Sequence, residues 1–193
     1  MTDFTLLAAR FALLARAWAS PAFLNYLRDN ELDIDVVNRV AGISAVIPIV
    51  VHDHYRWEFG RIGADPLGFV IEAMGRDGES VEDLVAWPID DPANVLSMFG
   101  RVGMVGLDNA FNPATYHLDK PLRMHRTPLR WLQSGGAGAA MVSPRLAAYD
   151  FLDIAGRIAG EDRRHAQELL AIAESVVVRG RFVSPVENLR IAA

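Results

Sequence analysis

The residues best suited to chemistry lie in one short segment, His52-Asp53-His54-Tyr55-Arg56-Trp57-Glu58. Side chains an even number of positions apart in a strand point to the same face. If the preceding strand continued through this segment, His52, His54 and Glu58 would therefore share one face. Two imidazoles and a carboxylate can bind Zn²⁺, Mn²⁺ or Fe²⁺ and leave one position open for water or substrate. The segment thus predicts a metal-dependent enzyme, a hydrolase or an oxygenase, with a solvated strand end as the alternative.

The His-x-His-x3-Glu spacing resembles the first metal motif of the cupins, a family of small β-barrel proteins. The flanking glycines do not follow the family's spacing, and the second half of the motif has no evident counterpart. His117 and His125 are the histidines left in the strand-rich middle to supply it. The resemblance implies His52, His54 and Glu58 as ligands, with His117 as the candidate fourth ligand.

A basic window forms the second candidate site. From Asp65 to Asp119 there are ten acidic and two basic residues, whereas the 30 residues from Lys120 to Tyr149 contain no Asp or Glu. Arginines around a helix start, expected here at Thr127-Pro128, can bind phosphate or carboxylate, and an aromatic side chain can add a stacking surface. The expected binding residues are Arg123, His125, Arg126, Arg130 and Trp131. The expected partner is an anion, such as nucleic acid, a nucleotide or an acidic protein face; the alternative is a solvated stretch that balances the acidic segment.

A third group is acidic and consists of Glu79, Glu82 and Asp83, followed by Asp90-Asp91. Paired carboxylates can act as acid and base or bind Mg²⁺. The sequence Asp90-Asp91-Pro92 is more typical of a turn after a strand.

Part of the middle of the chain is similar to uncharacterised bacterial proteins of prophages and integrated elements. The likeness lies in DLVAWPIDDP and in PLRMHRTPLRWLQSGGAGAAMV, with RTPLRWLQSG at its centre, and spans residues 83–142. It implies an accessory role in a mobile element and no assigned activity.

Composition narrows the class of protein. The chain has 193 residues, 51% of them hydrophobic, a net charge of −5 and no cysteine. This profile is typical of a folded globular domain and excludes disulfides, thiolate metal sites and cysteine nucleophiles. The N-terminal sequence lacks the basic region of a signal peptide, and no apolar run is long enough to span a bilayer. We therefore expect a soluble, cytoplasmic protein with no membrane contact.

The first helix carries an apolar stripe with steps of three and four residues, formed by Phe4, Leu7, Phe11, Leu14 and Trp18. Amphipathic helices usually bury such a stripe in their own domain, and this is the packing that we expect. The alternative is a homodimer in which the stripe pairs two subunits.

The remaining patterns predict an α+β fold with a central, mostly antiparallel sheet flanked by N-terminal and C-terminal helices. We expect one domain over 1–193, with a helical segment over 1–29, a strand-rich middle over 45–142 and C-terminal helices over 144–178. Within it, Pro48 places the strand Ala45–Val51 at an edge, and Gly75–Gly78 joins two strands in a hairpin.

The hypotheses for function are therefore three. The first is a binding or accessory protein that recognises an anion through the basic window. The second is a metal-dependent enzyme that uses the histidine segment. The third is a structural homodimer without catalytic activity.

Overall fold

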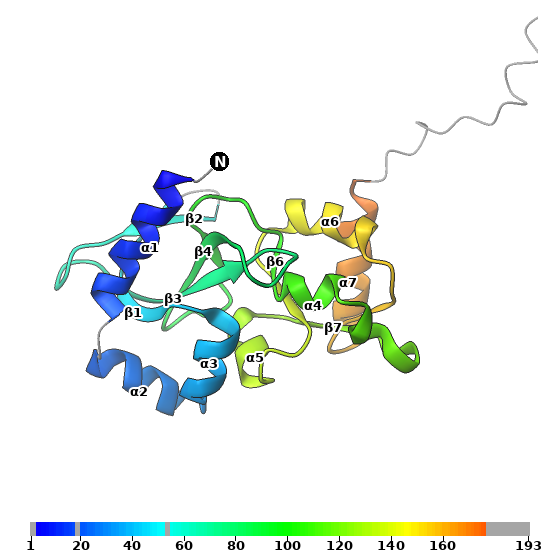
Figure 1. The fold of residues 1–193 in the computed structure, drawn as a ribbon, viewed down its shortest axis with the longest axis horizontal. Coiled ribbons are helices and arrows are strands. Elements are labelled where there is room, and N and C mark those ends of the chain that lie inside the picture. The colour runs from blue at the N-terminus through cyan, green and yellow to red at the C-terminus, as the bar shows by residue number, and fades with distance from the viewer. Residues whose placement is uncertain (1–2, 18–19, 53–54, 177–193) are drawn as a thin grey trace, which may run out of the picture.

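The structure, a computed structural model, describes residues 3–17, 20–52 and 55–176. It is an α+β fold in which two sheets lie next to each other, with helices at both ends (Figure 1). Strands β1–β5 form a closed five-stranded barrel, and strands β6–β9 form a second sheet of four strands. The predicted fold class is confirmed, although the strands divide into two sheets where the sequence suggests one.

Among the described residues, three helices precede the barrel, and side-chain caps start two of them. The Ser20 side chain accepts a hydrogen bond from the Ala22 backbone at the second helix, and Asp33 accepts one from Asp35 at the third. The helices are α1 (Phe4–Ala17), α2 (Pro21–Asp29) and α3 (Ile34–Ala41).

The barrel is closed by a parallel contact between β2 and β5, while its other four pairings are antiparallel. The predicted hairpin is present as β3 and β4. The strands of the barrel are β1 (Ser44–His52), β2 (Arg56–Phe59), β3 (Leu67–Met74), β4 (Val81–Pro88) and β5 (Leu96–Ser97).

The edge position expected for Pro48 is wrong, because β1 has a partner on each side. Residues 44–48 of β1 pair with β3, and residues 49–52 pair with β2. Pro48 lies at the end of the first pairing, and its carbonyl accepts a hydrogen bond from the Gly60 N–H. A residue without an N–H is tolerated there because one ladder ends and the next begins.

The described part of the second half, up to residue 176, combines a mixed sheet with four α-helices. In it β8 pairs with β6 antiparallel and with β7 parallel, and β9 pairs with β7 parallel. No helix within the described residues is long and apolar enough to cross a membrane. The elements are β6 (Met104–Val105), α4 (Leu107–Phe111), the 3₁₀ segment η1 (Pro113–Asp119), β7 (Leu122–His125), α5 (Pro128–Gln133), β8 (Ala139–Met141), α6 (Pro144–Asp153), β9 (Ile158–Ala159) and α7 (Arg163–Glu174).

The barrel interior is one apolar cluster to which all five strands and α1 contribute. A second cluster packs α2, α3 and α5 against the outside of the barrel and against the second sheet, so the core is shared by the two halves. Within this second cluster, Tyr26 stacks on Phe69 with ring centroids 4.7 Å apart, and its hydroxyl accepts a 2.8 Å hydrogen bond from the Trp87 indole.

The apolar stripe of α1 does not pack on its own domain, so that expectation is wrong for the described residues. Phe4, Phe11 and Leu14 are 79%, 64% and 43% exposed. The barrel is instead contacted by a different face of the helix, which buries Leu6 and Leu13 together with Ala9. Trp18 lies outside the described residues. A narrow row of smaller side chains meets the barrel closely, while the bulkier row is left on the surface.

Candidate functional sites

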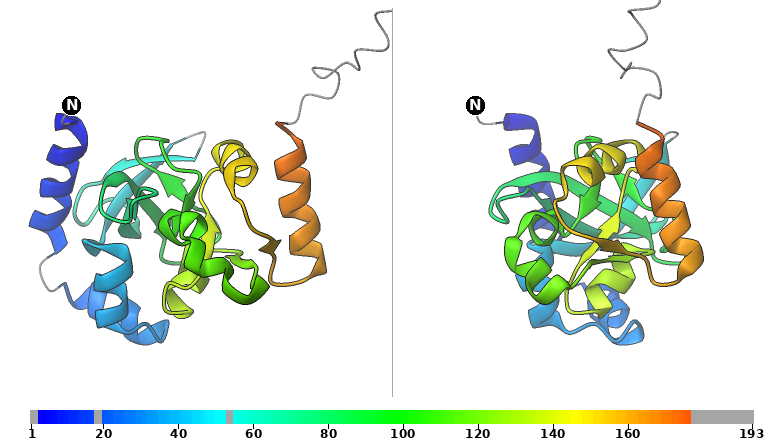
Figure 2. Two further views of the ribbon diagram at one scale, coloured as in Figure 1. Left: turned by 45° about the vertical axis from the view of Figure 1, so that its right-hand side comes forward. Right: turned by 90° about the vertical axis from the view of Figure 1, so that its right-hand side faces the viewer.

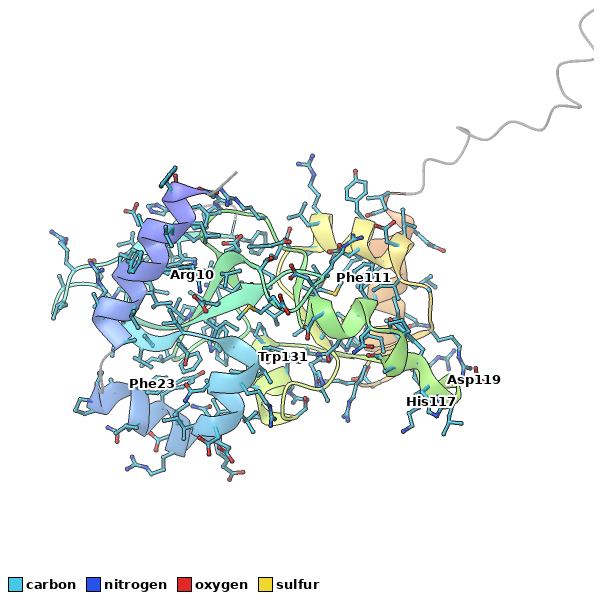
Figure 3. The ribbon with its side chains drawn as sticks, viewed as in Figure 1. Arg10, Phe23, Phe111, His117, Asp119 and Trp131 are labelled. Carbon is cyan, nitrogen blue, oxygen red and sulfur yellow. The ribbon has the colours of Figure 1, made fainter. Side chains whose placement is uncertain are left out.

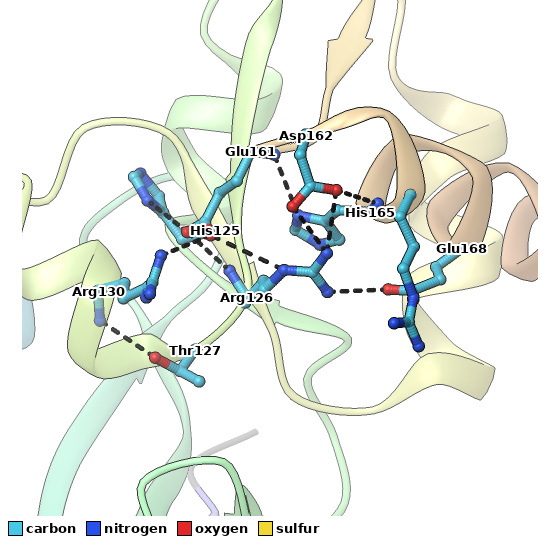
Figure 4. Close-up of polar contacts among 9 residues, drawn as sticks. His125, Arg126, Thr127, Arg130, Glu161, Asp162, His165 and Glu168 are labelled. Atoms are coloured by element: carbon cyan, nitrogen blue, oxygen red, sulfur yellow. Dashed lines mark hydrogen bonds and ion pairs between the residues drawn. The ribbon is translucent and has the colours of Figure 1, made fainter.

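The central arginine of the basic window is bound to carboxylates of the same chain (Figure 4). Arg126 follows β7, and one of its terminal nitrogens donates to both oxygens of Asp162 at 3.1 and 3.0 Å. Its other terminal nitrogen donates to Glu168 at 3.0 Å. Asp162 is the N-cap of α7 and Glu168 lies within the helix, so this arginine ties β7 to the C-terminal helix.

Glu161 joins three members of the window at the same place. Its carboxylate accepts a 2.8 Å hydrogen bond from Arg130 and a 3.2 Å bond from the Arg126 backbone N–H. Nδ1 of His125 lies 3.7 Å from the same carboxylate. We name this group the α7 clasp: His125, Arg126, Arg130, Glu161, Asp162 and Glu168.

Two carboxylates of the α7 clasp, Asp162 and Glu168, have the lowered pKa values expected for satisfied charges. The His165 backbone N–H, followed by the Arg126 guanidinium, holds the pKa of Asp162 below its ordinary value. Hydrogen bonding to Arg126 likewise lowers the pKa of Glu168. Hydrogen bonds to the charged form stabilise that form, so the ionised carboxylates support the fold at neutral pH.

Two further predicted binding residues have contrasting positions. The Trp131 side chain is buried, and its indole N–H donates to the Gly136 carbonyl at 2.9 Å. Trp131 therefore offers no exposed face for stacking. Arg123, on β7, is exposed.

Ser134, His125 and Glu161 are arranged in the order of a nucleophile, a base and an orienting carboxylate. The Ser134 hydroxyl lies 3.2 Å from Nε2 of His125. The same nitrogen is closer, 2.9 Å, to the Ala137 carbonyl, which can only accept and so requires a proton on Nε2. The Ser134 hydroxyl is itself 2.7 Å from the Trp131 carbonyl, its nearest acceptor. Nε2 of His125 carries a proton and the Ser134 hydroxyl is directed to a carbonyl, so the group is not arranged for nucleophilic attack. Its hydrogen bonds instead stabilise the turn that follows α5.

The histidine segment is a hairpin and not a continuous strand. Strand β1 ends at His52 and β2 begins at Arg56, with Tyr55 in a left-handed turn conformation between them. His52 and Glu58 still meet, because they are diagonal neighbours across the hairpin, where His52 pairs with Arg56 and Glu58 with Val50; Nε2 and Oε1 are 3.3 Å apart. The sharing of a face thus comes from strand pairing, and the reason given by sequence parity is corrected.

The residues that the structure describes do not complete a metal site there. His54 lies outside them, and His117 is at the far end of the molecule from β2 (Figures 1 and 3). Within residues 3–17, 20–52 and 55–176, no three His, Asp or Glu side chains are grouped as metal ligands. His52 and Glu58 alone do not fit the three-ligand site.

The sequence pattern did not single out a cleft between the β3–β4 hairpin, α1 and α6. A cavity of about 440 Å³ is lined on its polar side by Arg76, Asp77, Glu82, Arg101 and Asp150. A neighbouring cavity of about 370 Å³ shares Glu82 and Arg101 with it and extends along α1. We name the two together the charged cleft. Figure 2 shows α1 and α6 on either side of the β3–β4 hairpin, which contributes Arg76, Asp77 and Glu82 to the charged cleft.

Each arginine of the charged cleft already has a carboxylate partner. Arg76 donates to Asp150 at 3.2 Å and to Asp153 at 2.9 Å, and its guanidinium stacks over the Phe111 ring. Arg101 forms an ion pair with Asp3. Arg10 of α1 (labelled in Figure 3) donates to Glu72, which is only 3% exposed.

Glu82 is the carboxylate of the charged cleft whose environment opposes its charge. Partial burial, followed by repulsion from Asp77 and Asp150, raises its pKa. Burial also raises the pKa of Asp150, although Arg76 acts against this. In contrast, hydrogen bonds from Ser80 lower the pKa of Asp77 to about 2, so Asp77 stays ionised beside Glu82.

One fully buried carboxylate positions the floor of the charged cleft. Asp83 accepts hydrogen bonds from the Ser97 hydroxyl at 2.7 Å and from the backbone N–H groups of Phe99 and Arg101 at 2.9 and 2.8 Å. The buried Asp83 carboxylate thereby has hydrogen-bond partners, and the loop over 97–101 is fixed next to the cavity. Adjacent acidic residues on β4 have opposite roles, since Asp83 holds the fold and Glu82 faces the cleft.

Comparisons with models of protein families, with curated proteins and with solved structures give no match for this chain. The geometry of the chain itself therefore indicates its function.

Proposed function

We propose that this chain is a non-catalytic assembly protein that pairs with a second copy of itself through the exposed face of α1. The single observation that carries the proposal is that α1 has two apolar faces. One of them is covered by the barrel, and the other leaves Phe4 and Phe11 on the surface. Exposed apolar surface of this kind is typical of a protein interaction site.

The spacing of the exposed stripe is that of a helix pair. Phe4, Leu7, Phe11 and Leu14 are separated by three, four and three residues, the a and d pattern of a two-helix seam. At 100° per residue, this stripe lies about 135° around the helix from the face that contacts the barrel. A partner can therefore approach without displacing α1 from the barrel.

Charge favours an apolar partner over an acidic or basic one. Helix α1 contains no acidic residue, and its two arginines are engaged with its own domain. Arg10 is held by Glu72, and Arg16 donates to the Ala12 carbonyl and lies over the Phe59 ring. The seam itself is left without charge.

A second α1 provides an occupant of the right shape. In an antiparallel pair related by a two-fold axis, Phe4 faces Leu14 of the other copy and Leu7 faces Phe11. Every layer then contains one aromatic ring and one leucine, so the layers have equal volume and the surface complements itself. This self-complementarity is the reason for choosing a second copy over an unrelated helix.

The size of the contact sets the expected strength of association. One helix from each copy buries less than the roughly 1,200–2,000 Å² of a standard stable interface. We therefore expect a reversible dimer with a dissociation constant on the order of micromolar.

Sedimentation velocity over a wide range of protein concentration tests the proposal. Wild-type protein should move from monomer to dimer as its concentration rises, and Phe11→Asp should remain a folded monomer. Ile62→Asp is the matched control, because Ile62 is 87% exposed on a turn outside α1 and its substitution should leave dimerisation unchanged.

A wild-type chain that stays monomeric at every concentration would contradict self-association. An equal loss of dimer in Ile62→Asp would show that the contact lies elsewhere. If Phe11→Asp is poorly folded, Phe4→Asp gives the same test at the first turn of the helix, where a negative charge is favourable.

A further inference from the structure

The charged cleft has the dimensions and the polar lining of a ligand site. Its larger cavity, about 440 Å³, is within the range of small-molecule sites in proteins. Its walls come from segments far apart in the sequence, namely the β3–β4 hairpin, the loop before β6 and α6. Cavities of this kind, with several charged groups directed into one space, are the usual location of binding sites.

The balance of charge around the cleft is negative. Arg76 is bound by Asp150 and Asp153, Arg101 by Asp3, and Arg10 by Glu72. Asp77 and Glu82 are then present in addition to these pairs. A positive group entering the cleft would meet an excess of carboxylates, whereas an anion would compete with carboxylates already bound to the arginines.

Glu82 is the group with capacity for a ligand. It lies where the two cavities meet, and the ion pairs of the three arginines are made with other carboxylates. A carboxylate can accept hydrogen bonds at both oxygens, and a guanidinium or an ammonium supplies donors that match them. Tyr149 also lines the cavity, and an aromatic ring beside a cation can attract it.

We propose that the charged cleft binds a cationic nitrogen group, a guanidinium or an ammonium, through the Glu82 carboxylate and the Tyr149 ring. The repulsion that Asp77 and Asp150 exert on Glu82 is relieved when a positive charge enters, which adds to the favourable free energy of binding. This site and the pairing surface of α1 depend on different residues, although they adjoin at Leu7, which lines the smaller cavity. Phe4 and Phe11 do not line either cavity, and Glu82 and Tyr149 are not part of α1.

Two sources can supply such a group, a free amine or a basic side chain of a polypeptide. Isothermal titration calorimetry with agmatine represents the first source, and titration with the blocked peptide acetyl-Gly-Arg-Gly-amide represents the second. Saturable binding of agmatine alone identifies a small-molecule site, and tighter binding of the peptide identifies a polypeptide ligand. Either result supports recognition of a cation.

The variant Glu82→Gln keeps the shape of the side chain and removes its charge, so binding should weaken about tenfold or more. Glu79→Gln is the matched control, because Glu79 is an exposed glutamate of the same hairpin that does not line the cleft. It should bind as the wild type does.

Three results would overturn the proposal. They are the absence of saturable binding for both probes, equal affinity of wild type and Glu82→Gln, and an equal loss of affinity in Glu79→Gln. The same titrations with Phe11→Asp separate this proposal from the proposed dimer, because a monomeric variant should bind the probe with unchanged affinity.

Discussion

The α7 clasp and the charged cleft contain the same types of side chain in opposite states. In the clasp, Arg126 is saturated by Asp162 and Glu168, and both carboxylates have lowered pKa values. In the cleft, Glu82 and Asp150 have raised pKa values, although arginines are near. Where charges are matched they fasten two elements, and where carboxylates are in excess a ligand can complete the balance.

This difference shows that charge counted along the sequence does not locate a binding surface. The window over 120–149 contains no acid, yet its arginines bind carboxylates just before and within α7, more than thirty residues later. The acidic segment before it contributes Glu82 to a cavity. Free binding capacity depends on which charges the fold brings together.

Of the changes considered, replacing Asp83 should lower the free energy of unfolding most. Its buried carboxylate holds the loop over 97–101, which contributes Arg101 to the charged cleft. Asp83→Ala leaves the Ser97 hydroxyl and the N–H groups of Phe99 and Arg101 without their acceptor in a buried place. We expect a loss of about 3 kcal/mol in the free energy of unfolding, measured by urea denaturation. The exposed Asp90→Ala is the control, and equal stability of the two variants would show that the loop over 97–101 does not depend on this carboxylate.

Breaking the α7 clasp should have an intermediate and local effect. Arg126→Leu removes the bonds to Asp162 and Glu168, so α7 should detach more often from β7 while the barrel stays folded. Hydrogen exchange measured by mass spectrometry should rise about fivefold to tenfold across residues 163–174.

Arg123→Leu is the matched control for this change. Arg123 is exposed in the same basic window but takes no part in the ion pairs of the clasp. Its substitution should leave the exchange of α7 unchanged. If both variants raise exchange equally, the effect belongs to the charge of the window and not to the clasp.

Local signals in the sequence predict much of the fold because they act over a few residues. Thr127-Pro128 begins a helix as expected, and Gly75–Gly78 connects the expected hairpin. The barrel is closed by the parallel pairing of Arg56 in β2 with Ser97 in β5. Both strands are short and have no distinctive sequence pattern. Such a contact between distant residues leaves no local signal.

The sites were harder to predict than the elements for the same reason. The stripe of α1 has the period of a buried face, and the sequence does not show that the row with Leu6 and Leu13 fills the barrel first. His52 and Glu58 were expected to be close and are, but through pairing across a turn. The likeness to cupins and to proteins of mobile elements stays a prediction.

Acidification should act in opposite directions on the two regions. Asp162 and Glu168 have folded-state pKa values below the unfolded values of about 4, so their contribution to stability is complete at higher pH and is lost as pH falls through the folded-state pKa values. Glu82 has a raised folded-state pKa, so its ionisation opposes folding at neutral pH and its protonation removes this cost. The protection of α7 against exchange, measured relative to the intrinsic rate at each pH, should therefore fall in acid, while the repulsion on Glu82 is removed.

The smallest predicted effect concerns the charged cleft alone. Glu82→Gln should raise the free energy of unfolding at pH 7 by a few tenths of a kcal/mol, since solvent screens much of the repulsion at a partly exposed group. The difference from wild type should disappear near pH 4, where Glu82 is protonated and resembles glutamine. Glu79→Gln should show no such dependence on pH. If Glu82→Gln lowered stability at pH 7, the carboxylate would have to be satisfied within the fold, and both the contrast with the α7 clasp and the proposed cation site would be wrong.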